Sequence, residues 1–323
     1  MILITGVAGF IGFHLAKRLL KEGHEVLGID NLNDYYDVSL KEARLLQISG
    51  FQNFTFLKLD IADESAMQKL FCKHNFSRVI HLAAQAGVRY SLINPHAYVQ
   101  SNITGFLNVL QGCKEQKNIH LLFASSSSVY GVNTKTPFSL SDPTDCPASF
   151  YGATKKANEV MAHAYHHLYG TPMTALRFFT VYGPWGRPDM ALYKFTKAIL
   201  QGEPIELYNH GELLRDFTYI DDVIESLIRM LDTKNLEYKI YNIGNQTPVR
   251  LLDFVLSLEK TLGKKAKLKY LPMQPGDVLK TYADIDDLIK DFGYRPRTSV
   301  EDGIAKFCAW YLEYYPRKFG FVL

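Results

Sequence analysis

The sequence predicts an α/β fold in which a doubly wound parallel sheet is followed by a smaller C-terminal α/β domain. Short runs of apolar and β-branched residues alternate with amphipathic stretches through the first half of the chain. A glycine-rich turn joins the first run to the first amphipathic stretch, and an acidic residue ends the second run. Alternation at this spacing indicates right-handed βαβ units, whose strands form a parallel sheet.

The strands of this sheet are expected at residues 2–5, 25–30, 55–58, 79–82 and 120–124, and helices between them at 11–21 and 65–73. In such a sheet, ligands bind at the carboxyl ends of the strands. After residue 178 the pattern becomes more irregular, with clusters of proline and glycine. We therefore predict one domain over residues 1–178 and a smaller, substrate-binding domain over 179–323, with segments that return to the main sheet.

The glycine-rich turn has the form of a phosphate-binding loop. It follows the first strand, opens the first helix and includes Gly6, Gly9, Phe10, Ile11 and Gly12. Glycines let the backbone approach a diphosphate, whose charge is favoured by the free N–H groups of a helix start. Asp30 and Asn31 end the second strand, where a carboxylate accepts hydrogen bonds from an adenosine ribose and repels a 2′-phosphate. The combination predicts a Rossmann-type domain that binds NAD rather than NADP.

Tyr151 and Lys155 form a candidate catalytic pair at the start of a long amphipathic helix. Their spacing places the phenol and the ammonium on one helix face. A cation beside the phenol lowers the pKa of the phenol, so that the phenolate can take a proton from a sugar hydroxyl. Such pairs are common by chance, but here a phosphate loop precedes the pair and a run of four serines, 125–128, lies between the two motifs.

The Gly-x-x-Gly-x-x-Gly loop and the Tyr-x-x-x-Lys pair together resemble the extended branch of the short-chain dehydrogenase/reductase superfamily. The resemblance implies that Lys155 also binds the nicotinamide ribose and that Ser126 shares the substrate hydroxyl with Tyr151. Further cofactor contacts are implied at Asp60, Ile61, Leu82, Ala83, Ala84, Gln85 and Asn102.

Longer motifs resemble the UDP-glucuronate 4-epimerases of this superfamily over nearly the whole chain. They cover residues 30–36, 86–90, 125–128, 178–190 and 215–222. Sugar-nucleotide dehydratases of the superfamily carry Asp-Glu where this chain has Ser127 and Ser128. The resemblance therefore implies reversible C4 epimerisation of UDP-glucuronate to UDP-galacturonate through a 4-keto intermediate, with tightly bound NAD transiently reduced.

An acidic sugar places a carboxylate next to the reacting carbon, and a buried anion needs hydrogen bonds or a cation. Ser127, Ser128 and Thr180 offer hydroxyl donors, and the family uses these positions to hold the carboxylate. Arg187 matches a substrate-contacting arginine, and Arg215 matches an arginine that contacts the diphosphate. Capping of the strand end by the serines and solvation of Arg187 at the surface remain alternatives.

The remaining substrate contacts rest on the resemblance alone. The expected uridine pocket includes Met190, Leu192 and Tyr208, whose apolar members would equally suit a core. Gln274, near Asp277, stands where many sugar-nucleotide epimerases have a second phosphate-binding arginine. Because glutamine carries no charge, neutralisation of the diphosphate would rest on Arg215 and Arg89.

Other activities remain open from the sequence. A UDP-glucose or UDP-N-acetylhexosamine 4-epimerase would share the serine, tyrosine, lysine and NAD, and a UDP-glucuronate decarboxylase would share the substrate. A non-catalytic NAD-binding sensor would lack the tyrosine or the lysine, and both are present. His163, His166 and His167 have the spacing of zinc ligands, but no further ligand set accompanies them, so we expect a helix surface and no metal.

Composition indicates which classes of partner and which cellular compartment to expect. The net charge is +3 and no long single-sign block occurs, which gives little support to nucleic-acid or membrane binding. The four cysteines have no zinc or CxxC spacing and are expected to be buried free thiols in a reducing cytoplasm. The family pairs the helices after Asn102 and after Tyr151 across a two-fold axis, which implies a homodimer through a four-helix bundle.

Overall fold

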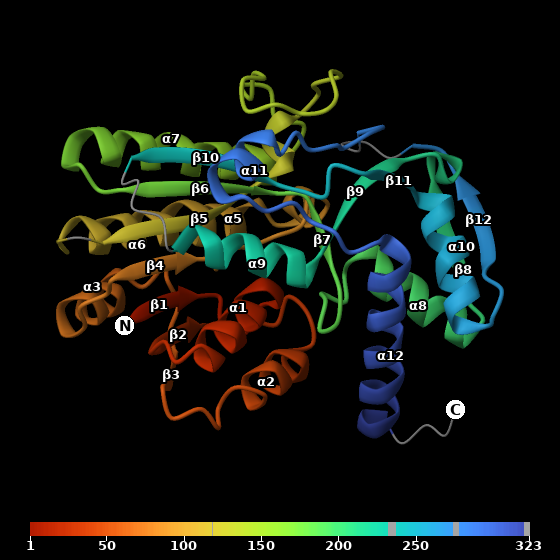
Figure 1. Cartoon of the computed structure of the whole chain (residues 1–323), viewed down its shortest axis with the longest axis horizontal. Coiled ribbons are helices and arrows are strands. Elements are labelled where there is room, and N and C mark those ends of the chain that lie inside the picture. The colour runs from red at the N-terminus through yellow and green to blue at the C-terminus, as the bar shows by residue number, and fades with distance from the viewer. Residues whose placement is uncertain (118, 232–236, 274–277, 320–323) are drawn as a thin grey trace.

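The computed structural model describes residues 1–117, 119–231, 237–273 and 278–319. Within these residues the largest sheet has seven strands in the order β10-β6-β5-β4-β1-β2-β3, and every neighbouring pair is parallel (Figure 1). Its strands are β1 (Ile2–Thr5), β2 (Val26–Asp30), β3 (Phe54–Lys58), β4 (Arg78–His81), β5 (His120–Ser126), β6 (Met173–Phe178) and β10 (Tyr238–Ile243). The predicted doubly wound α/β class is confirmed.

Helices cover both faces of this sheet. On one face lie α3 (Glu64–Lys73), α6 (Gly105–Lys114) and α7 (Phe150–Tyr169), and on the other lie α1 (Phe10–Lys21), α9 (Ile220–Leu231) and α11 (Asp286–Phe292). Successive side chains of a strand point to opposite faces. In β1, Leu3 therefore joins the core under α3 and α6, whereas Ile2 and Ile4 join the larger core under α1.

Shorter elements connect these layers. They are α2 (Val38–Leu46), α4 (Tyr90–Ile93), α5 (Pro95–Tyr98), the π-helical turn η1 (Val99–Thr104) and the 3-10 turn η2 (Ser127–Tyr130). The predicted strands and helices agree with the structure to within two residues, and β5 runs into the serine run as far as Ser126.

The later part of the chain builds two small sheets beside the large one (Figure 1). One has the order β11-β9-β7 and the other pairs β12 with β8. The elements of this part are β7 (Thr180–Tyr182), α8 (Ala191–Gln201), β8 (Pro204–Tyr208), η3 (Asn209–Gly211), β9 (Leu214–Tyr219), β11 (Pro248–Arg250), α10 (Leu251–Leu262), β12 (Lys267–Leu271) and α12 (Val300–Phe319). The division into two domains at residue 178 stays a prediction.

The strand order reverses beside β1, which pairs with β2 on one side and β4 on the other. A crevice forms at such a point, outside the carboxyl ends of the strands. Gly6, at the end of β1, has φ +72°, and a Cβ there would lie 2.7 Å from the Ala83 nitrogen after β4. Only glycine therefore lets the two strand ends approach this closely.

The expectation that all four cysteines are buried is wrong for two of them. Cys113 and Cys308 are buried, whereas Cys72 and Cys146 are exposed. Cys72 lies on α3 outside the buried stripe of that helix, and Cys146 lies in the loop before α7, where sequence composition does not fix exposure. All four are unpaired. Among the described residues, every helix is too short or too polar to cross a membrane.

Candidate active site

A cavity of about 440 Å³ lies at the carboxyl ends of β1, β4 and β5, a volume within the range of small-molecule sites. The predicted site residues that line it are Gly6, Gly9, Phe10, Ile11, Gly12, Asp30, Asn31, Ile61, Leu82, Ala83, Ala84, Gln85, Ser126, Ser127, Ser128, Tyr151, Lys155, Thr180, Arg187, Met190 and Arg215. The fold thus brings residues predicted for the cofactor and residues predicted for the substrate into one pocket.

The glycine loop fits a diphosphate. A Cβ on Gly12 would lie 2.2 Å from the Gly6 carbonyl oxygen, and a Cβ on Gly9 would lie 2.9 Å from the same atom. Gly9 is the N-cap of α1 and has no side chain to accept hydrogen bonds from the first helical turn. The N–H groups of this turn are therefore left for an anion bound in front of the helix.

Asp30 joins the loop to the end of β2. Its Oδ2 accepts a hydrogen bond from the Ala8 nitrogen at 3.1 Å, and its Oδ1 accepts one from the Leu32 nitrogen at 2.9 Å. Burial raises the pKa of the Asp30 carboxyl above its ordinary value. Beside it, the Lys41 ammonium donates to the Asn33 carbonyl oxygen at 2.7 Å and also lines the pocket.

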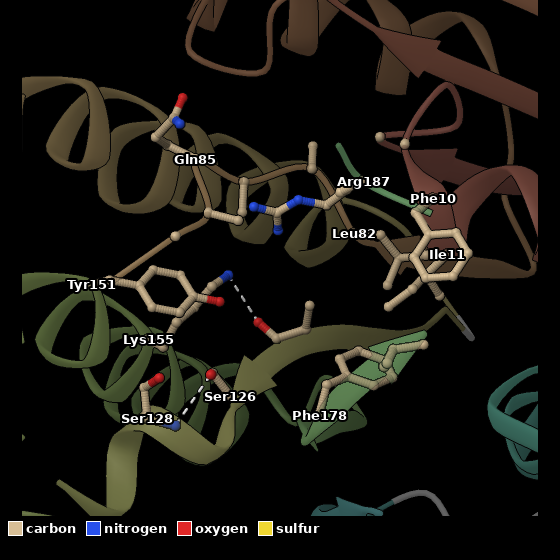
Figure 2. Close-up of a pocket in the computed structure, with 18 of the residues that line it drawn as sticks. Phe10, Ile11, Leu82, Gln85, Ser126, Ser128, Tyr151, Lys155, Phe178 and Arg187 are labelled. Atoms are coloured by element: carbon tan, nitrogen blue, oxygen red, sulfur yellow. Dashed lines mark hydrogen bonds between the residues drawn. The ribbon is translucent and has the colours of Figure 1, made fainter. Parts of the chain in front are cut away.

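Tyr151 and Lys155 lie on the first turns of α7, facing the pocket next to Ser126 (Figure 2). The helix begins here because the Ser149 hydroxyl accepts from the Gly152 nitrogen at 3.0 Å, as an N-cap does. The Lys155 ammonium donates to the Ala124 carbonyl oxygen at 3.0 Å, which ties α7 to the end of β5. The sequence spacing therefore places the Tyr151 phenol and the Lys155 ammonium on the same side of the cavity.

Burial dominates the protonation of this pair. It raises the pKa of the Tyr151 phenol, while Ser126 and Arg187 act in the opposite direction. Burial also lowers the pKa of Lys155 to about 8. The sequence led us to expect that Lys155 lowers the pKa of Tyr151, whereas here the opposing groups are Ser126 and Arg187.

The serines of the run 125–128 have different surroundings. Ser125 donates to Glu159 Oε1 at 2.6 Å, and Glu159 accepts two hydrogen bonds from Arg177, at 2.8 and 2.9 Å. The Ser126 hydroxyl accepts from the Ser128 nitrogen at 3.1 Å, which closes the η2 turn (Figure 2). The last two serines belong to this turn and line the pocket. All four serines line the cavity, but the Ser125 hydroxyl is engaged by Glu159, so we assign Ser125 a structural role.

Arg187 lines the pocket (Figure 2), and its side chain is only 22% exposed, so it is not a solvated surface residue. Its Nε donates to Asp189 Oδ1 at 3.0 Å and its Nη2 to Oδ2, and the Tyr35 hydroxyl donates to the same Oδ2 at 3.2 Å. Burial alone would lower the pKa of Arg187, but Asp189 holds it above the ordinary value. Arg187 therefore remains protonated and positively charged inside the cavity.

Two predicted cofactor residues lie behind the pocket wall. Asp60 accepts a hydrogen bond from the Asn31 amide at 2.9 Å, outside the cavity lining. Asn102 is buried and exchanges hydrogen bonds with the backbone of Gln85, at 2.8 and 3.0 Å. Asp60 thus holds the side chain of Asn31, and Asn102 holds the backbone of Gln85, two residues that line the cavity.

Three predicted substrate residues also lie off the cavity lining. Leu192 is in the hydrophobic core, the alternative that the sequence left open for it. The Arg89 guanidinium lies over the Tyr208 ring, 5.0 Å from its centroid. The predicted contacts Gln274 and Asp277 fall outside the described residues.

Several residues of the site escaped the sequence argument. Tyr35 and Asp189 belong to motifs quoted above, but the hydrogen bond between them joins residues 154 positions apart. No local sequence pattern predicts such a contact. Lys41 lines the pocket and Arg44 is fully buried, although both lie in an amphipathic segment where lysine and arginine are normally exposed. A polar residue at a core position of the helical period is the signal that would have found Arg44.

Two of the three histidines of α7 contact other protein groups. The His163 ring packs edge-on against Tyr238, with 5.3 Å between centroids, and His166 Nδ1 lies 2.9 Å from the Thr171 carbonyl oxygen. In the part of the chain that the structure describes, there is no cluster of potential metal ligands.

Comparison with known proteins defines the class. The family model "NAD dependent epimerase/dehydratase family" matches residues 2–244, and the chain belongs to this family. The match confirms the predicted fold class and NAD as the cofactor.

Individual relatives narrow the class further. The chain is 49% identical to UDP-glucuronate 4-epimerase 2 of Arabidopsis thaliana, covering 97% of this chain and 76% of the relative. It is 47% identical to a probable UDP-glucuronate 4-epimerase of Rhizobium meliloti, covering 98% of each chain. The crystal structure of the Bacillus cereus UDP-glucuronic acid 4-epimerase with UDP-glucuronic acid and NAD superposes with a TM-score of 0.91 at 36% identity, covering 97% of this chain and 99% of that chain. The resemblance to UDP-glucuronate 4-epimerases is confirmed.

Proposed function

We propose that this protein interconverts UDP-glucuronate and UDP-galacturonate by inversion at C4. One observation carries the proposal: a single pocket joins the Tyr151–Lys155 pair to a group of hydroxyls and a buried arginine that suit a carboxylate. The serine and threonine hydroxyls of this group are Ser127, Ser128 and Thr180, and the arginine is Arg187. Tight binding of NAD at the glycine loop completes the proposal.

In this proposal Tyr151 takes the proton from the C4 hydroxyl, with Ser126 sharing that hydroxyl. NAD, when bound at Gly6–Gly12 and Asp30, supplies reversible hydride transfer at C4. Lys155 keeps a positive charge beside the phenolate and binds the nicotinamide ribose. After the 4-keto sugar has turned to present its other face, Tyr151 returns the proton to the new hydroxyl.

The side chains proposed to bind the carboxylate have a second role in this proposal. The 4-keto intermediate is a β-keto acid, which tends to lose carbon dioxide. Ser127, Ser128, Thr180 and Arg187 would hold the carboxylate in an orientation that disfavours cleavage of the C–C bond. Arg215 lines the same cavity and is assigned to the diphosphate.

The direct test incubates the purified protein with UDP-glucuronate, without added NAD, and resolves the products by NMR. Conversion to UDP-galacturonate is expected for the wild type and is lost in Tyr151→Phe. A parallel incubation uses UDP-glucose and a UDP-N-acetylhexosamine. Conversion of a neutral sugar alone would overturn the proposal, and accumulation of UDP-xylose would identify a decarboxylase instead.

We further propose that the protein is a homodimer. Apolar side chains are exposed on α4, η1, α6 and α7, which pack against one another. They include Leu92, Ile93, Val99, Leu107 and Val160. A second copy placed across a two-fold axis would cover them in a four-helix bundle.

A cytoplasmic location and a role in polysaccharide biosynthesis complete the proposal. Four unpaired cysteines, two of them exposed, favour a reducing compartment. Thiol titration of protein from a soluble lysate tests the location, and loss of an acidic surface glycan in a strain without the protein tests the role.

A further inference from the structure

Arg44 is a fully buried arginine whose five N–H groups all donate hydrogen bonds. It lies on α2, with an exposed fraction of 0%. Nη1 donates to the Ala8 carbonyl oxygen at 2.9 Å and to the Tyr36 hydroxyl at 2.7 Å. Nε and Nη2 donate to the Trp185 carbonyl oxygen at 3.1 and 2.7 Å, and Nη2 also donates to the Gly186 carbonyl oxygen at 3.3 Å.

These bonds join two parts of the pocket that are far apart in sequence. Ala8 belongs to the glycine loop, and Trp185 and Gly186 belong to the turn that carries Arg187. Trp185 has φ +62°, a left-handed conformation that side chains disfavour, and its carbonyl receives two of the bonds from Arg44. A conformation of this kind persists only where the surroundings hold it.

A second side chain also forms a hydrogen bond with this turn. His14 on α1, the helix that follows the glycine loop, lies with Nε2 2.9 Å from the Pro184 carbonyl oxygen. Three consecutive carbonyls of the turn, at residues 184–186, therefore accept hydrogen bonds from side chains of α1 and α2.

Arg44 also carries a buried charge. Its five hydrogen bonds go to four neutral oxygens, and within the described residues no carboxylate lies in hydrogen-bonding distance of it, although the Asp30 carboxyl interacts with it electrostatically. Buried charges are normally balanced by an opposite charge. An anion seated on the glycine loop, to which Ala8 belongs, would add a second opposite charge to that of Asp30.

We propose that Arg44 is a positioning residue that ties the glycine loop to the turn carrying Arg187, so that dinucleotide binding orders the substrate side of the pocket. The inference rests on the proposed function only where it takes UDP-glucuronate as the substrate. By linkage, substrate binding strengthens retention of the dinucleotide by the same factor.

A double-mutant cycle separates positioning from general stability. Arg44→Lys keeps the charge and removes the planar fork of donors. We expect it to lower kcat/KM for UDP-glucuronate by about tenfold or more, mostly through KM. In an Arg187→Met background we expect less than about a twofold further loss, because Arg44 acts through Arg187. A similar loss in both backgrounds, or no loss in the wild type, would overturn the proposal.

Arg78→Met is the matched control. Arg78 also donates to a backbone carbonyl, that of Leu231, at 3.3 and 3.4 Å, but it lies at the amino end of β4, away from the pocket. We expect kcat/KM to stay within about twofold of the parent in both backgrounds. An equal loss in Arg78→Met would show that any arginine bonded to a backbone carbonyl has this effect, against the proposal.

A second measurement needs no turnover. The chain has two tryptophans, so Trp310→Phe leaves Trp185 as the only tryptophan. We expect NAD to reduce acrylamide quenching of Trp185 fluorescence in Trp310→Phe and to leave it unchanged in Trp310→Phe/Arg44→Lys. If NAD leaves quenching unchanged with Arg44 in place, or reduces it equally without Arg44, the proposal is wrong. If the wild type fails to convert UDP-glucuronate, only the proposed function fails, and this measurement still decides the role of Arg44.

Discussion

Burial controls the protonation of the side chains around the pocket. It lowers the pKa of Lys155 to about 8 and that of His81 to about 3, and the charge of Lys155 contributes to the shift of His81. His81 is held neutral against Thr5, with 2.8 Å between Nδ1 and the hydroxyl oxygen. Lys155 is therefore the buried cation next to Tyr151 that titrates nearest to neutral pH.

The lowered pKa of Lys155 predicts a pH dependence of stability in NAD-free protein. The unfolded chain keeps the proton up to pH 10.5, whereas the folded chain loses it above about pH 8. Between these values the unfolded state binds more protons, so the free energy of unfolding rises with pH. The full contribution is about 3 kcal/mol. Urea unfolding at several pH values within this window measures the rise.

Lys155→Met is the comparison for this prediction, because methionine has no titratable group. The difference in unfolding free energy between Lys155→Met and wild type should shrink steadily as pH increases. Equal pH slopes in the two proteins would show that Lys155 does not titrate in this range.

The hydroxyls that we propose to bind the carboxylate lead to a prediction about the product. Ser127→Ala, Ser128→Ala and Thr180→Ala combined remove three donors that line the cavity. We expect at least about a tenfold loss of epimerisation or the appearance of a decarboxylated sugar nucleotide, because the acid is no longer held. NMR of the products distinguishes these results. Normal epimerisation without a side product would refute this role.

At the scale of elements, an ion pair joins β5, β6 and α7 beneath the serine run. Glu159 and Arg177 have side chains only 3% exposed, and Glu159 also accepts from Ser125. Tyr130, in the η2 turn, accepts from Arg177 at 3.0 Å and donates to Asn242 of β10 at 2.7 Å. The turn that presents Ser127 and Ser128 is thus anchored to three strands.

Glu159→Ala should lower the free energy of unfolding by about 3–5 kcal/mol, because it leaves the Arg177 charge buried and uncompensated. Urea unfolding measures the change. Glu225→Gln is the control: Glu225 pairs with Arg229 and Arg18 in partly exposed ion pairs, and its loss should cost about 1 kcal/mol or less. Comparable losses in the two variants would contradict the importance assigned to the buried pair.

What the sequence predicts well at this scale is local. The glycine loop, Asp30 and the Tyr151–Lys155 pair depend on short spacings, and all of them line the pocket. Leu192 was ambiguous because an apolar residue suits a core and a pocket equally, and only packing decides between them. The helical period marks Arg44 as a buried position, but two of its hydrogen-bond partners lie 36 and 141 positions away in the chain, and periodicity cannot identify them.

At the scale of the whole molecule, the exposed apolar face on α4, η1, α6 and α7 predicts the oligomeric state. Val160 lies on α7 and is 57% exposed, on the same helix as the inward-facing Tyr151 and Lys155. A second copy covering this face would therefore stiffen the helix that carries the catalytic pair. Dimerisation and catalysis would share one element.

Val160→Glu should convert the wild-type dimer to a single chain of 36.8 kDa, measured by size-exclusion chromatography with light scattering. Leu46→Glu is the control, because Leu46 is an even more exposed apolar residue, at 73%, and lies on α2 outside this face. The control should remain dimeric. A monomeric wild type, or a dimeric Val160→Glu, would exclude this interface.

The pairing of β10 with β6 has a consequence for synthesis and folding. β6 is buried at every position, and its outer edge is covered by β10, a strand that begins 60 residues after β6 ends. A fragment that stops at Phe178 would present an unpaired edge of buried-type residues, which is prone to associate with other chains. The large sheet therefore gains its edge strand β10 only after Ile243 has been synthesised. Until then, the exposed edge of β6 in the nascent chain needs protection from association with other chains.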